Sequence, residues 1–134
     1  MDGVFDLFHR GHLEAIKKVR IEAGIEGTVI IGIVSDTDAN SYKRWPIINE
    51  KDRVEIVSNI KDVDKVIFPC PMYVSKEFIE KHQIDLVVHG FADNNDFEKQ
   101  KEFFKNIIDI GKFKVHEYYK GSSTTEIIKK IKEI

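Results

Sequence analysis

Short runs of apolar, β-branched residues alternate with longer amphipathic segments along the chain. The clearest run, Thr28–Val34 (TVIIGIV), lies between Gly27 and the pair Ser35-Asp36. It is too short for a buried helix and therefore predicts a buried strand. Three more strands are expected at Val66–Phe68, Asp85–His89 and Phe113–Tyr118.

Helical periodicity fills the intervals between these runs. In residues 12–24, apolar side chains recur at Leu13, Ile16 and Val19, and Gly24 stands where a helix would stop. Comparable segments predict helices over residues 50–60, 75–84, 97–111 and 123–134. Strands that alternate with helices of this length predict an α/β fold, Rossmann-like and three-layered (α/β/α), with a mainly parallel sheet of about five strands.

The two ends of the chain carry separate expectations. Only Met1–Phe5 precede the first turn, so the first strand is expected to be truncated. Near the other end, Ile127, Ile128, Ile131 and Ile134 share one face, which predicts a helix docked on the core. A helix lying on a membrane surface is the alternative, but the segment is short and carries acidic residues.

Composition narrows the class of protein. The 134 residues, 42% of them hydrophobic and without repeats or linkers, predict one domain over residues 1–134. A net charge of −2 argues against a generally cationic nucleic-acid binder. The single cysteine, Cys70, excludes a disulfide framework, and the longest apolar runs are too short for membrane insertion. We therefore expect a cytoplasmic protein with no nucleic-acid partner.

The densest group of chemically useful residues is DGVFDLFHRGHLEAI near the N-terminus. His9 and His12 stand three residues apart at a predicted helix start, so their imidazoles share a face beside free backbone N–H groups. Such a site suits a polyphosphate, and Gly11 would let a phosphate approach the backbone. The spacing alone leaves open a pair of metal ligands, or histidines without a role.

DGVFDLFHRGH resembles the HxGH block of the nucleotidyltransferase superfamily, and more narrowly that of the cytidylyltransferases that make CDP-choline, CDP-ethanolamine and CDP-glycerol. Further segments are similar in the same order: YKRWPIINEKDRVEIV, IKDVDKVI and, after Gly121, SSTTEII. The likeness spans nearly the whole chain. It implies an enzyme that transfers CMP from CTP to a small phosphorylated alcohol and releases pyrophosphate, in phospholipid-precursor synthesis.

The resemblance implies catalytic roles for His9, His12 and Lys43. The histidines would hold the α- and β-phosphates, and Lys43 would bridge the incoming phosphate and the α-phosphate. An ordinary solvated lysine is the alternative at position 43. Mg²⁺ is expected to accompany CTP, with no residue assigned as its ligand. The nucleotide-binding residues implied are Gly3, Val4, Phe5, Gly11, Arg53, Gly121, Ser123, Thr124 and Thr125.

One departure from the family pattern bears on activity. Tyr118-Tyr119 replaces the family's Arg-Thr pair before Gly121, and Lys120 is at best a partial substitute. A lost charge-assisted contact is worth about 1.5–3 kcal/mol, which predicts a raised KM for the nucleotide. The alternative from another functional class is a nucleotide-binding module with little turnover.

The implied acceptor-binding residues are Asp2, Tyr73 and His89. Asp2 matches the acid that faces the ammonium group in the choline enzymes, whereas Met72 stands where those enzymes carry a tryptophan. Loss of this aromatic face weakens the binding of a quaternary ammonium more than that of a primary one. The kcat/KM for phosphoethanolamine is therefore expected to equal or exceed that for phosphocholine. Glycerol-3-phosphate as the acceptor, or ATP as the donor, is the alternative.

The resemblance also implies a homodimer. In the family the first strand–helix block and an Arg-Tyr-Val-Asp element meet across a two-fold axis, and here LFHRGH and IKDVDKV hold those positions. Lys61-Asp62 replaces the Arg-Tyr pair of that element.

Overall fold

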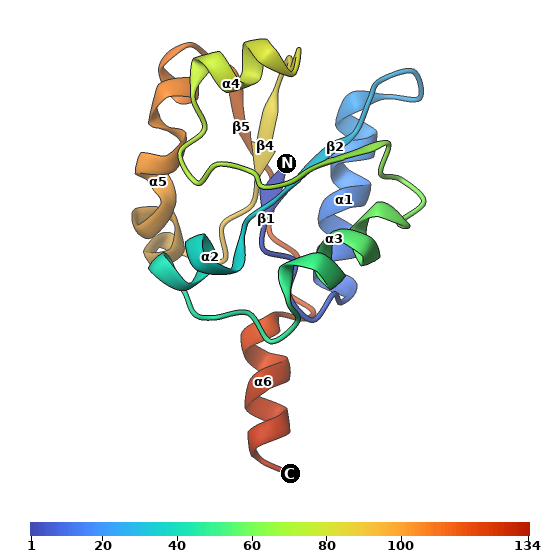
Figure 1. Ribbon diagram of the computed structural model, residues 1–134, viewed down its shortest axis with the longest axis vertical. Coiled ribbons are helices and arrows are strands. Elements are labelled where there is room, and N and C mark those ends of the chain that lie inside the picture. The colour runs from blue at the N-terminus through green and yellow to red at the C-terminus, as the bar shows by residue number, and fades with distance from the viewer.

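The computed structural model describes residues 1–134, and its strands and helices alternate as predicted (Figure 1). All strand pairings are parallel, and they form a three-stranded sheet in the order β1-β2-β3 and a two-stranded sheet of β4 and β5. The strands are β1 (Asp2–Gly3), β2 (Ile30–Ile33), β3 (Lys65–Ile67), β4 (Val87–His89) and β5 (Phe113–Val115).

The prediction of one sheet of about five strands is therefore wrong in its connectivity. β1 is only two residues long, and it pairs with β2 alone. A strand of two residues is too short to bridge β2 and β4 along their length, so the sheet divides between β1 and β4.

The helices form the outer layers of the predicted three-layer arrangement. In Figure 1, α1 and α3 lie on one side of the strands, and α4 and α5 lie on the other. The helices are α1 (Arg10–Ala23), α2 (Asp36–Tyr42), α3 (Glu50–Ser58), α4 (Lys76–Lys81), α5 (Asn94–Asp109) and α6 (Thr124–Lys132).

The end of α1 and the whole of α2 show how far local sequence specifies a helix. α1 ends before Gly24, whose φ of 78° is favourable only for glycine, as the sequence predicted. Helix α2 was not predicted, because its sequence DTDANSY has no apolar periodicity. It begins because the side chain of Ser35 accepts from the backbone N–H of Asp38, and because acidic residues in its first turn favour the helix dipole.

Each face of the strands has its own hydrophobic core. On the side of α1 and α3, Ile16 and Val57 pack against the buried β2 residues Ile31 and Ile33. On the side of α4 and α5, the core residues are Val74, Ile79, Val87, Phe103, Phe104 and Ile107. These two cores hold the strands rigidly enough to position side chains at their ends.

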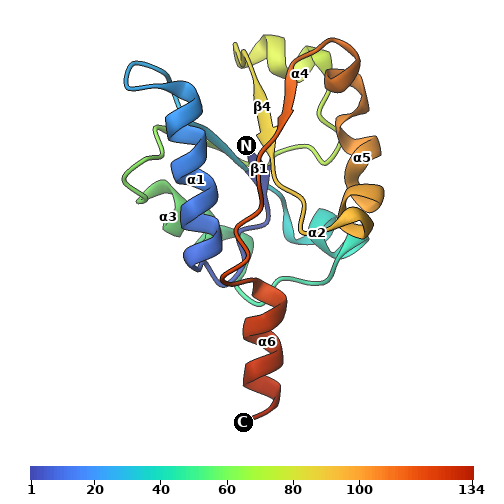
Figure 2. The ribbon, with the colours of Figure 1, turned by 180° about the vertical axis from the view of Figure 1, so that it is seen from behind.

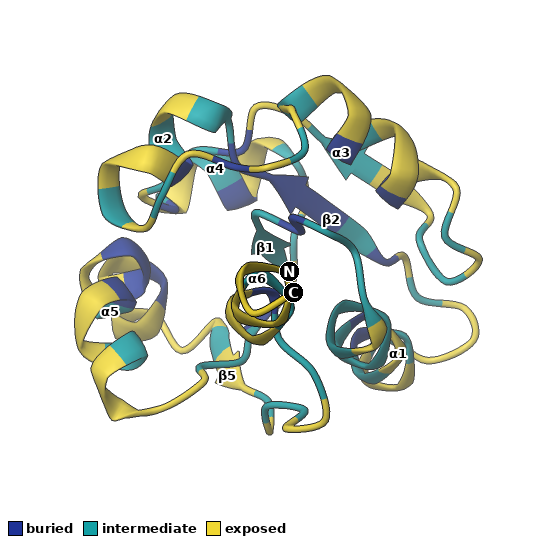
Figure 3. Ribbon diagram, turned by 90° about the horizontal axis from the view of Figure 1, so that it is seen from below, coloured by how far each residue is buried: buried dark blue, intermediate teal, exposed yellow.

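Helix α6 projects away from the body of the molecule (Figures 1 and 2). Thr124 is the only buried residue of this helix, and Ile131 is 58% exposed. The view from below in Figure 3 shows the outer turns of the helix in the exposed colour. The prediction that its apolar face docks on the core is therefore wrong, because only the first turn reaches the rest of the fold. None of the helices has the length and apolar character needed to cross a bilayer.

Candidate active site

A cleft of about 860 Å³ opens where β1 ends, at the N-termini of α1 and α6. In α/β folds ligands bind at this end of parallel strands, beside helix N-termini. Thirteen of the fifteen residues predicted for the site line the cleft, and the two that do not are Arg53 and Tyr73. The thirteen are Asp2, Gly3, Val4, Phe5, His9, Gly11, His12, Lys43, His89, Gly121, Ser123, Thr124 and Thr125.

The loop from β1 to α1 turns sharply through two left-handed residues. Phe5 has a φ of 57° and Leu7 a φ of 48°, values that cost energy for side chains of this size. Asp6 between them is buried, and its carboxylate accepts hydrogen bonds of 2.8 Å from the backbone N–H groups of Ile47 and Ile48. Asp6 therefore ties the loop after Lys43 to the loop that leads into His9. Sequence analysis did not single out this residue.

His9 and His12 cap the first turn of α1 reciprocally. His9 is the N-cap residue, and its Nδ1 accepts from the N–H of Gly11 at 2.9 Å. The backbone N–H of His9 donates in turn to Nδ1 of His12 at 3.2 Å. Because both Nδ1 atoms accept, each neutral ring carries its proton on Nε2. The ring centroids lie 3.9 Å apart, so the two imidazoles form one polar surface.

The start of α6 is joined to this pair. Nε2 of His9 lies 3.2 Å from the hydroxyl of Thr124, and that hydroxyl donates to the carbonyl of Asp6 at 3.0 Å. Ser122 Oγ lies 3.1 Å from Nδ1 of His9. A Cβ at Gly11 would meet the carbonyl oxygen of Ser122 at 2.8 Å, so glycine is needed there for the close approach of this segment. The structure thus adds the close approach of Ser122 as a reason for glycine at this position, beside the predicted room for a phosphate.

Burial keeps both histidines neutral. Desolvation lowers the pKa of His12 to about 3, and the neighbouring His9 and Lys43, which would repel a protonated ring, act in the same direction. Desolvation and Lys43 also lower the pKa of His9. At pH 7 each ring therefore presents a neutral Nε2–H, and the Nε2–H of His12 is left available to a ligand.

Two cations lie side by side at the other wall of the cleft. Lys43 caps the C-terminus of α2, and desolvation within the cleft lowers its pKa, as does the adjacent charge of Arg44. Nε of Arg44 is buried and has no hydrogen-bond partner in the protein. Arg44 was not predicted as a site residue, although its position directly after Lys43 could have indicated a second cation at the site. Both side chains line the cleft that His12 also lines, and together they supply positive charge there.

The end of the cleft near β4 holds a carboxylate and an imidazole. Asp2 and His89 come from neighbouring strands, and Oδ1 of Asp2 lies 3.3 Å from Nδ1 of His89. Phe91 and Phe104 pack against the His89 ring with centroids 4.8 Å away. Burial and the nearby Asp2 charge raise the pKa of Tyr42, so its hydroxyl remains protonated. This end can therefore bind a small cationic or hydrogen-bonding group.

Tyr73 lies outside the cleft, contrary to its predicted place beside Asp2 and His89. Its side chain is 59% exposed and packs edge-on against Phe103, with ring centroids 5.0 Å apart. Met72 also lies outside, where its sulfur accepts from the hydroxyl of Ser41 at 3.4 Å. The segment after β3 thus directs these two side chains towards α2 and α5.

Arg53 is buried completely and does not line the cleft. Its guanidinium donates to the carbonyls of Ile48, Val4 and Val34 and to the carboxylate of Asp36, at 2.7–3.0 Å. The structure therefore places Arg53 outside the cleft in which it was predicted to contact the nucleotide. Arg53 braces the backbone of the β1 loop from behind.

The cleft has no preformed metal centre. No group of three or more His, Cys, Asp or Glu side chains is placed to hold a metal ion. Its charged lining instead includes the side chains of Lys18, Lys43, Arg44, Lys120 and Lys130, a set that suits phosphate oxygens.

Comparison with known proteins shows which family this chain belongs to. A family model described as cytidylyltransferase-like matches residues 1–130. The chain belongs to the cytidylyltransferase-like family. Within this family, choline-phosphate cytidylyltransferase of Saccharomyces cerevisiae is 35% identical over 135 residues, which cover 97% of this chain and 30% of that protein. Ethanolamine-phosphate cytidylyltransferase of Dictyostelium discoideum is 35% identical over 136 residues, covering 98% of this chain and 36% of that protein.

Another relative is similar in length to this cytidylyltransferase-like chain. FAD synthase of Methanothermus fervidus is 36% identical over 135 residues, covering 98% of this chain and 92% of that protein. The chain therefore spans about a third of the choline- and ethanolamine-phosphate enzymes but nearly all of this one.

A solved structure supports the fold. The crystal structure of the lipopolysaccharide core biosynthesis protein from Thermoplasma volcanium matches with a TM-score of 0.66 and 23% identity, covering 90% of this chain and 94% of that one. At this identity the likeness concerns the α/β architecture alone.

Proposed function

We propose that this domain transfers a cytidylyl group from CTP to a small phosphorylated alcohol, with phosphoethanolamine preferred to phosphocholine. The observation that carries the proposal is the convergence in one cleft of two neutral imidazoles, Lys43 and the first turn of α6. Similarity to choline- and ethanolamine-phosphate cytidylyltransferases supports this substrate class. The product would serve phospholipid-precursor synthesis.

In the proposed reaction, a phosphate oxygen of the acceptor attacks the α-phosphorus of CTP. The bond from that phosphorus to the oxygen leading to the β-phosphate breaks, and pyrophosphate leaves with the bonding pair. Such a transfer needs positioning and charge stabilisation more than covalent catalysis. The Nε2–H of His12 would donate to a phosphate oxygen, and Lys43 would hold the attacking and α-phosphate groups together.

The start of α6 suits the leaving group. The Ser123 side chain accepts from the N–H of Glu126 and so caps the helix, while Thr125 is exposed on its first turn. The hydroxyl and free N–H groups here would bind the β- and γ-phosphates. Lys120 and Arg44 would supply the charge that the Tyr118-Tyr119 pair does not.

Mg²⁺ would be brought by the triphosphate, since the cleft offers cationic side chains and no cluster of metal ligands. When bound, the ion would neutralise part of the triphosphate charge. The protein's own cations would then orient the nucleotide and the acceptor.

Asp2 and His89 would select the acceptor. An ammonium group can donate hydrogen bonds to the Asp2 carboxylate, whereas glycerol-3-phosphate offers that carboxylate no positive charge. Since Tyr73 does not reach this end of the cleft, it adds no aromatic face there for a quaternary ammonium, and Met72 stands outside as well.

A second candidate is adenylyl transfer to a flavin phosphate. The observation that favours it is the match to nearly the full length of an FAD synthase. The two candidates share the chemistry at the α-phosphate and differ in the nucleotide and the acceptor.

One experiment tests both candidates. The chain is incubated with Mg²⁺ and α-labelled CTP or ATP, each in parallel with phosphoethanolamine, phosphocholine, glycerol-3-phosphate or FMN. The proposal expects CDP-ethanolamine as the main labelled product, and FAD from ATP and FMN would establish the second candidate. The His12→Ala variant is the matched inactive control. Binding of nucleotide without product in every arm would identify a nucleotide-binding module.

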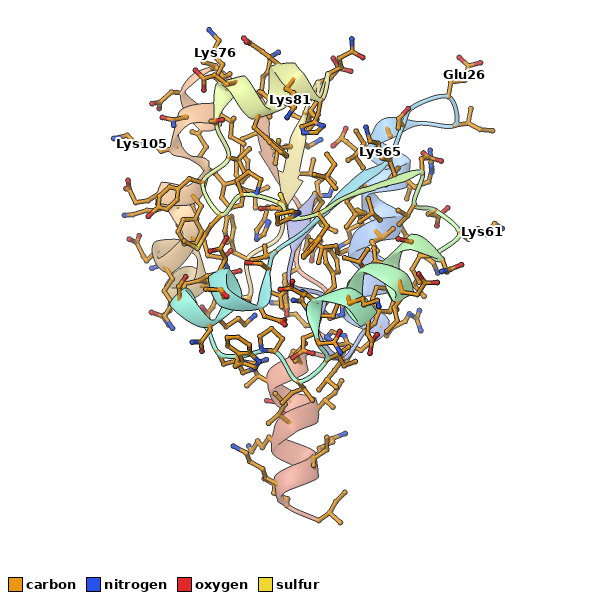
Figure 4. The ribbon with its side chains drawn as sticks, in the orientation of Figure 1. Glu26, Lys61, Lys65, Lys76, Lys81 and Lys105 are labelled. Atoms are coloured by element: carbon orange, nitrogen blue, oxygen red, sulfur yellow. The ribbon has the colours of Figure 1, made fainter.

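We further propose that the domain is a homodimer in which the segments LFHRGH and IKDVDKV meet across a two-fold axis. Within the second segment Lys61 is exposed and points into solvent (Figure 4), so it is free to contact a second copy. Light scattering should give the dimer mass at micromolar concentration, and a monomer mass there would refute the proposal.

A further inference from the structure

The end of the cleft near β4 is bounded by α5 as well as by the strands. Two consecutive residues of this helix, Phe103 and Phe104, make the contacts that matter here. The ring of Phe104 packs against His89, with centroids 4.8 Å apart. The ring of Phe103 packs edge-on against Tyr42 of α2 at 5.2 Å, and Figure 1 shows α2 beside the first turns of α5. Tyr42 therefore lies at the same end of the cleft as His89, and both residues line it.

The hydroxyl of Tyr42 is available to a ligand. No protein group forms a hydrogen bond with it, and Nε of Arg44 is the only unpaired polar side-chain atom that is sealed from solvent. The Tyr42 hydroxyl is therefore reached from the cleft that this residue lines. Burial raises its pKa, and the charges of Asp2 and Asp96 act in the same direction, so the hydroxyl keeps its proton at neutral pH.

Asp96, which was not predicted as a site residue, lines the cleft from the start of α5 and is fixed by two hydrogen bonds. Its Oδ1 accepts from Nε2 of the buried Gln100 at 2.6 Å, and its Oδ2 accepts from the N–H of Ala92 at 2.9 Å. Each carboxylate oxygen can still accept another hydrogen bond. Since the charges of Asp2 and Asp96 both act on the hydroxyl of Tyr42, two anionic groups and one neutral hydroxyl gather at this end of the cleft.

We propose that the carboxylates of Asp2 and Asp96 and the hydroxyl of Tyr42 form a binding site for a primary ammonium group, which makes Tyr42 a residue that determines acceptor specificity. This inference rests on the proposed function and deepens it. A primary ammonium has three N–H donors, one for each of these groups. A quaternary ammonium is attracted by the two charges but can donate nothing to the hydroxyl. Lys43 follows Tyr42 directly, so the cation proposed for the acceptor's phosphate lies next to the site for its amine.

A graded set of acceptors tests this ammonium site. Phosphoethanolamine, its N-methyl and N,N-dimethyl forms and phosphocholine carry successively fewer N–H donors, and phosphocholine carries none. Tyr42→Phe keeps the ring and its contact with Phe103 and removes only the hydroxyl. Its kcat/KM for phosphoethanolamine should fall by roughly tenfold or more, because a hydrogen bond to a charged group is lost. The loss should shrink along the series and vanish for phosphocholine.

Tyr73→Phe is the matched control. Tyr73 packs edge-on against the same Phe103 ring, at 5.0 Å, but lies outside the cleft, so this variant should keep the wild-type kcat/KM for every acceptor. Asp96→Asn is a second variant of the site. It removes a charge and should lower kcat/KM for all four amines while that for glycerol-3-phosphate stays unchanged. An equal loss for all four amines in Tyr42→Phe, or no loss for any of them, would overturn the proposal.

Binding measured without turnover separates this site from the proposed reaction. The four amines are titrated calorimetrically into the wild type and Tyr42→Phe in the presence of α,β-methylene-CTP, whose α–β link does not break. A selective loss of affinity for phosphoethanolamine in Tyr42→Phe would support the site even if the labelled-CTP assay gave no product. Turnover of the amines without this selectivity would overturn the site and leave the proposed reaction standing. Neither binding nor turnover of any amine would overturn both.

Discussion

Nε2 of His9 lies 3.2 Å from the hydroxyl oxygen of Thr124, although 115 residues separate them in the sequence. The same hydroxyl donates to the carbonyl of Asp6, so one threonine links the histidine loop to the first turn of α6. Through this link the two segments are joined at the cleft that both of them line. Thr124 is buried, which makes the link inaccessible to competing water.

The Thr124→Val variant tests this link, because valine keeps the shape and removes the hydroxyl. Burying Nε2 of His9 without its partner should reduce the free energy of unfolding by about 1–3 kcal/mol, measured by urea denaturation. The kcat for nucleotidyl transfer should fall by roughly tenfold or more as the two segments lose register. Thr37→Val, an exposed change on α2, is the matched control. Wild-type kinetics in Thr124→Val would show that the link does not position the cleft.

The low pKa of His12 predicts a specific loss of stability in acid. The unfolded chain takes up a proton at the ordinary histidine pKa of about 6.5, whereas the folded protein does so only near the lowered pKa of about 3. Stability is therefore complete above pH 6.5 and declines as the pH falls towards 3, by roughly 4 kcal/mol in total. His12→Asn should lack this part of the decline in urea titrations from pH 8 to pH 4. Parallel curves for the variant and the wild type would contradict the neutral, buried state of His12.

Lys43 should be required for turnover. Lys43→Ala removes a mobile cation from between two phosphates and should lower kcat by roughly 10²–10³-fold in the labelled-CTP assay. Lys43→Arg should recover little, because the planar guanidinium has a different reach and geometry. The exposed Lys51→Ala on α3 is the matched control and should behave as wild type. Normal turnover in Lys43→Ala would remove the lysine from the mechanism.

Substitution of Arg53 should lower the stability of the fold, and should not merely weaken nucleotide binding. Arg53→Lys cannot reproduce four bonds to separate acceptors, and it leaves Asp36 poorly paired, so unfolding should become easier by about 3–5 kcal/mol. Differential scanning calorimetry of this variant, with the exposed Arg10→Lys as the control, measures the effect. An unchanged Tm with a raised KM for the nucleotide would restore the direct contact predicted from the sequence.

Asp2 should distinguish between acceptors. Asp2→Asn removes the negative charge beside His89 and should lower kcat/KM for phosphoethanolamine and phosphocholine by roughly tenfold or more. The value for glycerol-3-phosphate should change little, since that acceptor presents no cation. Competition between the three acceptors provides the measurement. An equal loss of kcat/KM for all three acceptors would show that Asp2 supports the fold of β1 and does not discriminate between acceptors.

The alternation of strands and helices, the end of α1 at Gly24 and the position of the histidine pair could all be predicted from the sequence. These features depend on local chemistry: apolar periodicity, the freedom of glycine at positive φ, and polar residues at helix starts. The family motifs added thirteen residues that the fold gathers into one cleft. Such residues are predictable because neighbouring parallel strands end at the same edge.

Which side chains reach the cleft depends on contacts between remote segments of the folded chain. Arg53 belongs to a matching segment, yet its guanidinium turns inward because three backbone carbonyls and Asp36 converge on it from distant segments. The apolar face of α6 predicted docking, but whether a partner surface lies opposite a helix depends on the direction in which the chain leaves the last strand. The division of the sheet has the same origin, because pairing across β1 requires a strand long enough to meet both neighbours. Hydrogen bonds and burial between remote segments are properties of the folded arrangement, and no local pattern encodes them.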